Sequence, residues 1–422
     1  MPNRRWLRIM PVALAMYTLG FINRTNVSLA LPAMSRDLHM DPTQAGIIAG
    51  IFFWGYLLLQ IPGGDLAERW SAKRYVNICL VVWGLAAFTC GLARTWREEL
   101  AIRFLLGVAE GGMYPATVIL ISHWFPRRER ARANAFFSLA LPIALIISSP
   151  LSGWLMDRWN WRVMLMVEGT FPLLFIPVWL MGMADHPHEA RWISTDEREF
   201  LQAVLAREAA EREPAQAENY LLTLFQPQVL ILCAIKFLTL AAQLGYLFWL
   251  PAALGKTAKL SNLLTGSIVS IPYVVGAISM VLLSWHSDKK AERRGHVSFA
   301  MGVGGACLLA GVLVVGRMPL QGFVLMCLAG IGAFGPMGPF WAMTTENFSR
   351  KMAGSVAGLV NGLGNLGGVV GPFVVGYLNK QTGSFTYGFG ALALFLLVGS
   401  ALPYFVAPAR APAPVPAVAE SR

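Results

Sequence analysis

The stretch from Arg103 to Pro115, RFLLGVAEGGMYP, lies in an apolar run that continues to Trp124, which predicts the middle of a membrane-spanning helix. It nevertheless carries Arg103 and Glu110, and a charge near the bilayer centre costs about 2.5–3.5 kcal/mol on insertion scales. Seven residues make about two helical turns, so both side chains point to one side, roughly 10 Å apart along the axis. Gly107 on that side lets a neighbouring helix approach closely. The stretch therefore predicts the wall of a polar cavity, with a cation for an anionic ligand and a carboxylate for a proton.

Apolar runs of this length recur along the whole 422-residue chain, which is 56% hydrophobic and only 14% charged. Soluble domains are about 25% charged, and about 20 apolar residues span a bilayer as a helix. We therefore predict an all-α membrane protein with twelve transmembrane helices, since a soluble protein would not repeat such runs from end to end. The expected helices cover residues 9–34, 44–67, 75–94, 98–124, 133–156, 162–184, 227–252, 263–285, 297–316, 319–345, 353–379 and 385–407.

A polar break in the middle of the chain separates the expected helices into two groups of six. Within it, Ser194 and Glu197 have the spacing of a capping box ahead of an apolar stripe. The stripe consists of Phe200, Leu201, Val204 and Leu205. We expect a cytoplasmic amphipathic helix here, serving either as a structural strap or as a site of regulation. The predicted divisions are an N-terminal six-helix half at 1–184, this linker at 185–226, a C-terminal six-helix half at 227–407 and a disordered Pro/Ala-rich tail at 408–422.

The net charge of +11 raises the question of a nucleic-acid partner. The basic residues lie between the apolar runs, however, and the loops on the side of the termini carry more than twice as many as the opposite loops. This bias predicts that both termini are cytoplasmic and that the partner is the lipid bilayer, with no nucleic acid. The cysteines lie in apolar runs without a CxxC pair, and His186 and His188 only superficially suggest a metal pair. We therefore expect no disulfide, no metal and no cofactor.

The two groups of helices share a loop pattern. After the second expected helix comes GDLAERWSAKR at 64–74, and after the eighth comes SWHSDKK at 284–290. Each has a small residue, an acid four positions on and then a base. Two parallel six-helix repeats are a known plan of transporters, with the substrate site at mid-membrane between them. A conformational latch, or alternatively a set of ordinary solvated charges, is predicted on the cytoplasmic side at Glu68, Arg69, Asp288 and Lys289.

With these features the chain resembles the major facilitator superfamily over nearly its whole length. Segment 64–74 resembles the loop signature of that superfamily, with Glu68 in place of the usual aspartate and Ser71 in place of the second glycine. Within the superfamily the chain is similar to the anion:cation symporters, a group of organic-acid transporters. The stretches that carry this similarity are 22–26, 103–110, 123–126, 161–162 with 168–169, 185–187, 190–192, 196–198, 339–341 and 361–372.

The resemblance implies that charged residues of the first and fourth helices bind substrate and protons. Arg24 offers a bidentate fork to a carboxylate, and Arg103 is expected either to bind substrate or to keep Glu110 ionised. The symporter group usually has an acid before the arginine of the first helix. This chain has Asn23 there, which cannot titrate but can hydrogen-bond a ligand. Glu110 is therefore the main candidate for the proton carrier, and the stoichiometry of coupling, or proton coupling itself, is left open.

A set of polar side chains within the expected helices completes the candidate site. The predicted substrate-binding residues are Arg24, Arg103, Tyr56, Asn23, Tyr246, Gln243, Thr344, Asn361 and Asn365. Each has a structural alternative, which is an ion pair for the charged residues and packing or interhelical hydrogen bonding for the others. Lys236 in the seventh helix is unusual, and its role is left open because it could also snorkel to the cytoplasmic interface.

The sequence thus predicts a secondary active transporter, not an enzyme, that imports a small organic anion with protons by alternating access. We expect a monomer in the inner membrane of a bacterium. One alternative is a uniporter or exchanger of organic anions without proton coupling. Another is a drug:proton antiporter, although the fifth helix, with SLALP at 138–142, lacks the glycines usual in that group. A membrane enzyme or a receptor is disfavoured, since the chain has no HExxH or GxSxG motif and no cluster of His and Cys.

Overall fold

The computed structural model describes residues 4–210, 226–257, 261–348 and 350–407, so the tail predicted at 408–422 lies outside the described residues. Every regular element in the described ranges is helical. The first half of the chain contains α1 (Arg4–Thr25), α2 (Val27–Asp37), α3 (Pro42–Arg69), α4 (Ala72–Cys90), α5 (Trp96–Gly111), α6 (Met113–Trp124), α7 (Arg127–Ser138), α8 (Ala140–Arg158), α9 (Trp161–Gly182), η1 (Pro187–Glu189) and α10 (Thr195–Ala210). The second half contains α12 (Pro227–Thr257), α13 (Asn262–Lys290), α14 (Arg294–Val314), α15 (Pro319–Leu328), α16 (Gly330–Phe334), α17 (Met337–Glu346), α18 (Arg350–Asn365), α19 (Gly367–Thr382), α20 (Phe385–Ala401) and η2 (Leu402–Phe405).

Eleven helical segments among the described residues are long and apolar enough to cross a membrane. The remaining expected span corresponds to α4, whose 19 residues are helical but whose first turn carries Lys73 and Arg74, which lower its mean hydropathy. All twelve spans predicted from the sequence are therefore helices. Their ends differ by several residues, since the first, expected at 9–34, covers Arg4–Asp37.

Several spans are interrupted where the sequence analysis expected one continuous helix. The first breaks at Asn26, between α1 and α2, and the fourth breaks at Gly112, between α5 and α6. Pro115 accounts for the second break, because proline has no N–H to donate to the carbonyl group of Gly111 one turn earlier. The two breaks lie beside Arg24 and Glu110 in the sequence, so both charged residues sit at irregular points of their spans.

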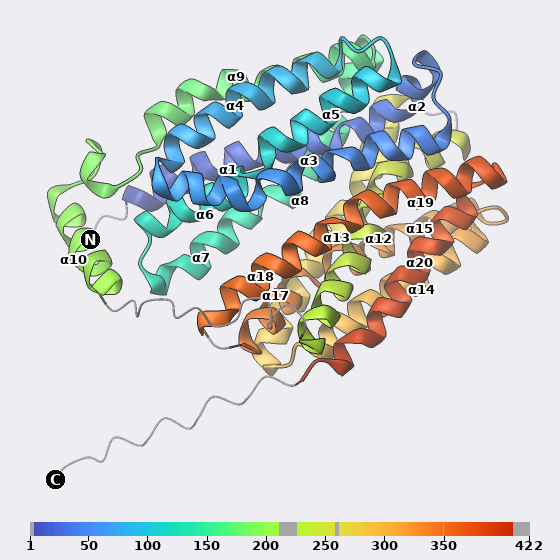
Figure 1. The fold of residues 1–422 in the computed structure, drawn as a ribbon. Helices are drawn as coiled ribbons and strands as arrows, with labels where there is room; N and C mark the ends of the chain where they lie inside the picture. Colours follow the sequence, from blue (N-terminus) through green and yellow to red (C-terminus); the bar gives the residue numbers. More distant parts are fainter. Residues whose placement is uncertain (1–3, 211–225, 258–260, 349, 408–422) are drawn as a thin grey trace.

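The helices form two groups that lie side by side, α1–α9 in blue to green and α12–α20 in yellow to red (Figure 1). The groups meet where α3 packs against α19 and α8 packs against α13. Glycines allow this close approach: a Cβ at Gly46 would lie 2.6 Å from the carbonyl oxygen of Pro372, and one at Gly266 would overlap the carbonyl oxygen of Ser149. The residue boundaries of the two halves stay a prediction.

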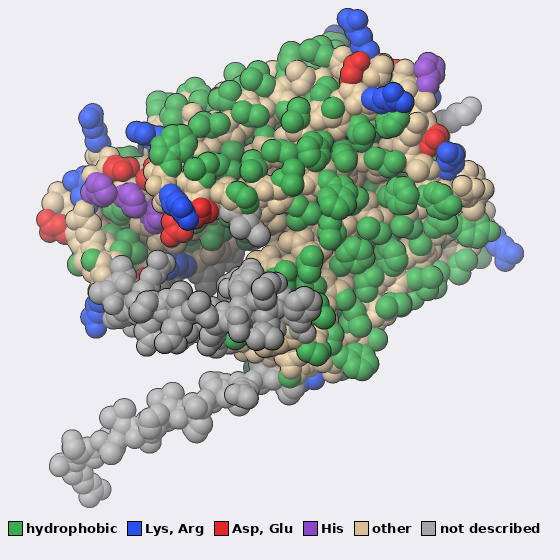
Figure 2. Space-filling view, viewed as in Figure 1, with side chains coloured by type: hydrophobic (Ala, Val, Ile, Leu, Met, Phe, Trp, Pro, Cys, Tyr) green, Lys and Arg blue, Asp and Glu red, His purple; other side chains and the backbone are tan. Residues whose placement is uncertain are grey.

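The outer surface is divided between an apolar belt and charged ends. Figure 2 shows hydrophobic side chains covering the flank of the molecule, with most Lys, Arg, Asp, Glu and His side chains gathered at the two ends. Large apolar residues of the flank that are more than half exposed include Leu85, Leu105, Leu282, Leu313 and Leu394. Such a surface would be unstable in water and fits the hydrocarbon region of a bilayer.

Helix α10 of the linker lies at one end of the first group, next to the start of α1 (Figure 1). The Ser194 hydroxyl accepts the N–H of Glu197 at 3.4 Å, as the capping spacing predicts. The Glu197 carboxylate does not complete the capping box but binds the buried Arg5 guanidinium at 2.6 Å. Of the apolar stripe, Leu201 is buried and Phe200 is 40% exposed. The helix is thus tied to the N-terminal group by a buried ion pair, which favours the strap over a free regulatory segment.

The crossing of α3 and α5 depends on two glycines and yields a first prediction. A Cβ at Gly107 would overlap the carbonyl oxygen of Phe52, and one at Gly55 would overlap that of Phe104. Gly107→Val should therefore force the helices apart and destabilise the protein by about 1–3 kcal/mol, measured as a lower melting temperature in detergent. Gly390→Ala is the matched control, since a Cβ there meets nothing within 4 Å. Equal melting temperatures of the two variants would contradict this packing.

Candidate functional site

A buried ion pair joins the first and fourth spans at the centre of the first group of helices. Arg24 Nη2 donates to Glu110 Oε2 at 2.8 Å, and both side chains are less than a tenth exposed. The guanidinium carbon of Arg24 lies over three aromatic rings, at 4.6 Å from the centroid of Phe21 and 4.9 Å from those of Phe52 and Tyr56. Glu110 Oε1 is buried without a hydrogen-bond partner among the described residues. The pair therefore has an open acceptor position in an aromatic enclosure.

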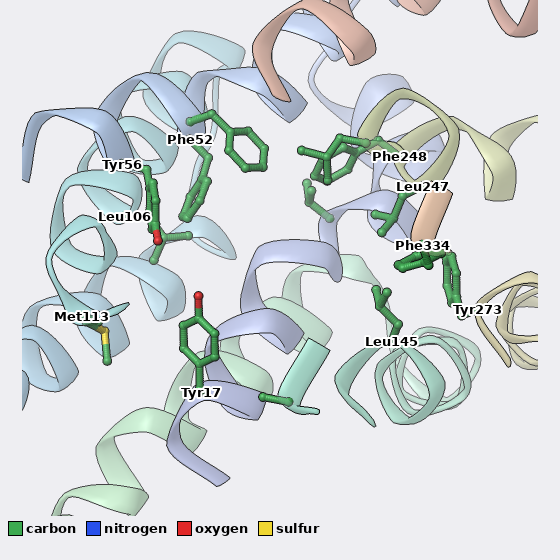
Figure 3. Close-up of a cluster of buried hydrophobic side chains, with 14 of the residues drawn as sticks. Tyr17, Phe52, Tyr56, Leu106, Met113, Leu145, Leu247, Phe248, Tyr273 and Phe334 are labelled. Atoms are coloured by element: carbon green, nitrogen blue, oxygen red, sulfur yellow. The ribbon is translucent and has the colours of Figure 1, made fainter. Parts of the chain in front are cut away.

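Two tyrosines face the Arg24–Glu110 pair. Figure 3 shows the hydroxyl groups of Tyr17, from α1, and Tyr56, from α3, pointing toward one another. The Tyr17 ring stacks on Phe137 at 4.6 Å between centroids and lies 5.7 Å from Tyr114. The sequence analysis named Tyr56 but missed Tyr17. The available signal was its position seven residues before Arg24, which places both on one face of the helix.

Arg103 is buried elsewhere on α5 and forms no ion pair among the described residues. Only 1% of its surface is exposed, and Nε and Nη2 have no hydrogen-bond partner. Glu99, one turn earlier on the same helix, is fully buried, and both of its carboxylate oxygens are likewise without a hydrogen bond in the described part of the chain. The sequence analysis missed Glu99, although an acid four residues before an arginine is a visible signal.

Asn23 and Asn26 flank Arg24 but point to different partners. The Asn23 amide donates to the carbonyl oxygen of Leu19 in its own helix at 3.4 Å. The Asn26 amide, at the break of the first span, donates to Glu168 Oε2 at 2.7 Å, and the Ser152 hydroxyl donates to Glu168 Oε1 at 2.6 Å. Glu168 is therefore a fully buried acid that these two neutral side chains hold in place.

The candidate residues of the second half bond mainly within that half. The Tyr246 hydroxyl donates to the carbonyl oxygen of Met326 at 2.9 Å, and the Thr344 hydroxyl donates to that of Phe340, also at 2.9 Å. Gln243 is buried and Asn361 is half-buried, and neither has a side-chain hydrogen bond among the described residues. The Asn365 amide instead donates to Gln60 Oε1 of α3 at 3.3 Å and so connects the two groups of helices.

The four residues predicted as a latch make no contact between the two groups among the described residues. Arg69 pairs with Asp65 one turn earlier on the same exposed face, at 2.8 Å. Asp288 pairs with Arg293 at 2.6 Å, and the Lys289 ammonium lies 5.4 Å from the centroid of Trp285. Glu68 lines a hollow with His123 and His186. Their role as a latch stays a prediction.

Contacts between the groups occur at the opposite end, for which the sequence analysis made no prediction. Asp41, ahead of α3, pairs with Lys380 of α19 at 3.0 Å. Asp157 of α8 accepts the backbone N–H groups of Asn262 and Leu263, at 2.8 Å each, at the start of α13. This end of the molecule is therefore closed.

The Asp41–Lys380 contact is insensitive to mild acid. Burial acts to raise the pKa of Asp41, but hydrogen bonds from the Gln44 N–H and the Lys380 ammonium lower it below its ordinary value of 3.8. A depressed pKa keeps the carboxylate ionised, so the ion pair is lost only as the pH falls through that lowered pKa. Between pH 5 and 8, protonation of Asp41 therefore does not break this ion pair.

The structure has long apolar helices in two groups, a charged pair buried among them and contacts that close one end. Together these features define a membrane transporter. A family model described as Major Facilitator Superfamily matches residues 13–372, and the chain belongs to this superfamily. It is accordingly a multi-pass membrane protein and a transporter, not an enzyme.

Relatives from several bacteria match nearly the full length of the chain. A protein of Agrobacterium vitis whose name describes a tartrate transporter is 34% identical, covering 93% of this chain and 92% of its own. One of Acinetobacter baumannii, named as a quinolone resistance transporter, is 30% identical and covers 94% and 93%. One of Escherichia coli K12, whose name describes a galactarate/D-glucarate transporter, is 27% identical and covers 87% and 86%.

Among solved structures, the chain is similar to a bacterial homolog of the human lysosomal transporter Spinster in an inward-facing, occupied conformation. The TM-score is 0.78 at 17% identity, with 96% of this chain and 97% of that chain covered. At this identity the likeness establishes the fold alone, and it confirms the predicted fold class.

Proposed function

We propose that the protein imports a small organic anion, such as a sugar acid, together with protons by alternating access. The observation that carries the proposal is the buried pair of Arg24 and Glu110 at 2.8 Å. A guanidinium group binds a substrate carboxylate in the same way that it binds glutamate. The substrate can therefore replace Glu110 as the partner of Arg24 once Glu110 takes up a proton. The relatives whose names describe transporters of tartrate and of galactarate/D-glucarate support an organic acid as the cargo.

The surroundings of Arg24 suit this exchange of partners. The rings of Phe21, Phe52 and Tyr56 keep water from the guanidinium group, which strengthens its attraction for a carboxylate. We expect the hydroxyl groups of Tyr17 and Tyr56, which point toward one another in Figure 3, to donate to substrate oxygens. Glu110 is the proposed proton carrier. The further substrate contacts that we propose are Asn23, Gln243, Tyr246, Thr344, Asn361, Asn365 and Arg103.

The charge balance sets the driving force. One proton carried with a monoanion moves no net charge, so the pH difference and the substrate gradient drive its uptake, and the membrane potential does not. Asn23 cannot add a second proton. Uptake of a monocarboxylate that follows the membrane potential would contradict this stoichiometry.

The conformation fits one step of the transport cycle. Asp41–Lys380 and the Asp157 contacts close the end opposite the termini, while the predicted latch residues at the other end make no contact between the helix groups in the described ranges. With cytoplasmic termini, as the basic loops predict, this is an inward-facing state. The proposed latch at Glu68, Arg69, Asp288 and Lys289 would close in the outward-facing state.

Asp157→Ala should shift the equilibrium toward the outward-facing state by up to about fivefold. The carboxylate accepts two N–H groups at the start of α13, and an anion at a helix N-terminus contributes about 0.3–1 kcal/mol. Labelling of a cysteine introduced at Ser267 would report opening of this end. Asp37→Ala is the matched control, because Asp37 accepts from Trp161 within one group of helices. Equal labelling in both variants would contradict the contact's role.

Transport itself is tested with purified protein in proteoliposomes. A pH gradient, alkaline inside, should drive accumulation of labelled tartrate, galactarate or a related acid above its outside concentration. Uptake that is equal with and without the gradient would favour the uncoupled uniporter. The relative named for quinolone resistance favours a second candidate, drug export in exchange for protons. Proton-driven quinolone movement without organic-acid uptake would establish that function instead.

A further inference from the structure

Lys236 is a buried cation of the second half that the proposed function has not yet used. It lies on α12, roughly 14 Å along the helix from its start at 1.5 Å per residue, and only 8% of its surface is exposed. Its ammonium group forms no ion pair or hydrogen bond among the described residues. A buried charge without a counterion is costly, so the site is incomplete as it stands.

The surroundings hold this lysine in a defined position. The ammonium nitrogen lies 5.4 Å from the ring centroid of Trp341, within the range of a cation–π contact. The aliphatic stem packs against Gly364 of α18, where a Cβ would overlap the Cγ of Lys236. Any other residue at 364 would displace the lysine. Helices α12, α17 and α18 therefore hold the lysine in place together, and its side chain does not snorkel freely to the interface.

The residues that surround Lys236 lie next to the contact between the two groups of helices. Asn365, the residue after Gly364, donates to Gln60 Oε1 of α3 in the other group. Arg24 belongs to that other group, so each group contributes a buried cation, and Arg103 is a further one in the first group. The cations differ in state, because Arg24 is paired with Glu110 and Lys236 has no acidic partner among the described residues.

We propose that Lys236 forms a second carboxylate subsite, so that the transporter selects dicarboxylates over monocarboxylates. The inference rests on the proposed function, in which Arg24 binds the first carboxylate after Glu110 is protonated. With Glu110 neutral, the charges of Arg24 and Lys236 balance a substrate that carries two carboxylates. A monocarboxylate leaves the Lys236 charge unpaired. Trp341 and Gly364 act as positioning residues because they place the ammonium group.

The test uses pairs of acids that differ at one end only: tartrate against threonate, and galactarate against galactonate. Inhibition constants are measured in proteoliposomes for the wild type, Lys236→Gln, Lys236→Arg and Lys290→Gln. Lys290 is an exposed lysine at the end of α13 and serves as the control. The wild type should prefer each dicarboxylate about 10-fold to 100-fold, the value of one charge-assisted hydrogen bond. Lys236→Gln should erase this preference while leaving the constants of threonate and galactonate unchanged, and Lys236→Arg should restore part of it.

Several outcomes separate this inference from the proposed function. If the wild type transports none of the four acids, the proposed function fails. If it transports all four without preference, or if Lys236→Gln weakens mono- and dicarboxylates equally, only the second subsite fails. The membrane potential tests the proposed function separately, because a dicarboxylate carried with one proton moves one negative charge inward. An inside-positive potential should accelerate tartrate uptake and leave threonate uptake unchanged, and equal responses would contradict the one-proton stoichiometry and not the second subsite.

Discussion

Arg24→Gln should reduce organic-acid uptake in proteoliposomes at least about 100-fold and abolish detectable binding. The substitution removes both N–H donors that bind the carboxylate, and charge-assisted pairs of this kind are the strongest polar contacts in proteins. It also leaves Glu110 buried without its cation, which costs about 3–5 kcal/mol and favours a permanently protonated acid. Uptake and calorimetric binding should therefore be lost together.

Two further variants make the Arg24 result interpretable. Arg24→Lys keeps the charge but not the planar fork and should retain weak uptake, because lysine acts as a point charge. Arg36→Gln removes an exposed arginine from the last turn of α2 and should behave as the wild type. Melting temperatures in detergent separate lost binding from lost folding. Normal uptake by folded Arg24→Gln protein would refute the substrate role of this residue.

Glu110→Gln should uncouple transport from protons while sparing exchange. Glutamine is a neutral stand-in for the protonated acid, so Arg24 stays available to the substrate at every pH. Accumulation driven by a pH gradient should fall to the equilibrium ratio, a loss of at least about tenfold, because one proton across one pH unit supplies about 1.4 kcal/mol. Counterflow of labelled substrate against unlabelled substrate should persist and lose its pH dependence.

The control for Glu110 is Glu199→Gln, which alters an exposed acid of α10. Its accumulation and pH dependence should match those of the wild type. If Glu110→Gln still accumulates substrate under a pH gradient, the proton is carried elsewhere. The fully buried Glu99 and Glu168 are then the acids to replace next.

The sequence indicated the spans well because crossing a bilayer is a local requirement. About 20 apolar residues are needed wherever a helix crosses, whatever it packs against. The prediction therefore succeeded even for α4, where Lys73 and Arg74 dilute the apolar run. The break at Gly112 follows from Pro115 and could have been expected. Nothing in the local sequence marks the break at Asn26 in the same way.

For the candidate site too, the sequence indicated the local features but not the contacts between distant residues. Buried charges stand out in an apolar run, so Arg24, Arg103 and Glu110 are recognisable as candidates from the amino-acid sequence alone. Their partners are not. Arg24 pairs with Glu110, 86 residues away, whereas Arg103, on the same helix as Glu110, forms an ion pair with none of the three acids of that helix. Which acid pairs with which arginine depends on how far each helix is rotated about its axis when it packs.

The sequence by itself thus determined a twelve-span helical transporter and marked the charges within its spans. Only the tertiary structure decided that Asn365 reaches Gln60, that Asp157 holds the start of α13 and that Lys236 lies against Trp341 with no acidic partner in the described part of the chain. The physical reason is the distance along the chain between the residues that interact. Helix formation and membrane crossing are set by neighbouring residues and the lipid, whereas these contacts join helices whose facing sides are fixed by packing between glycines and side chains far apart in the chain.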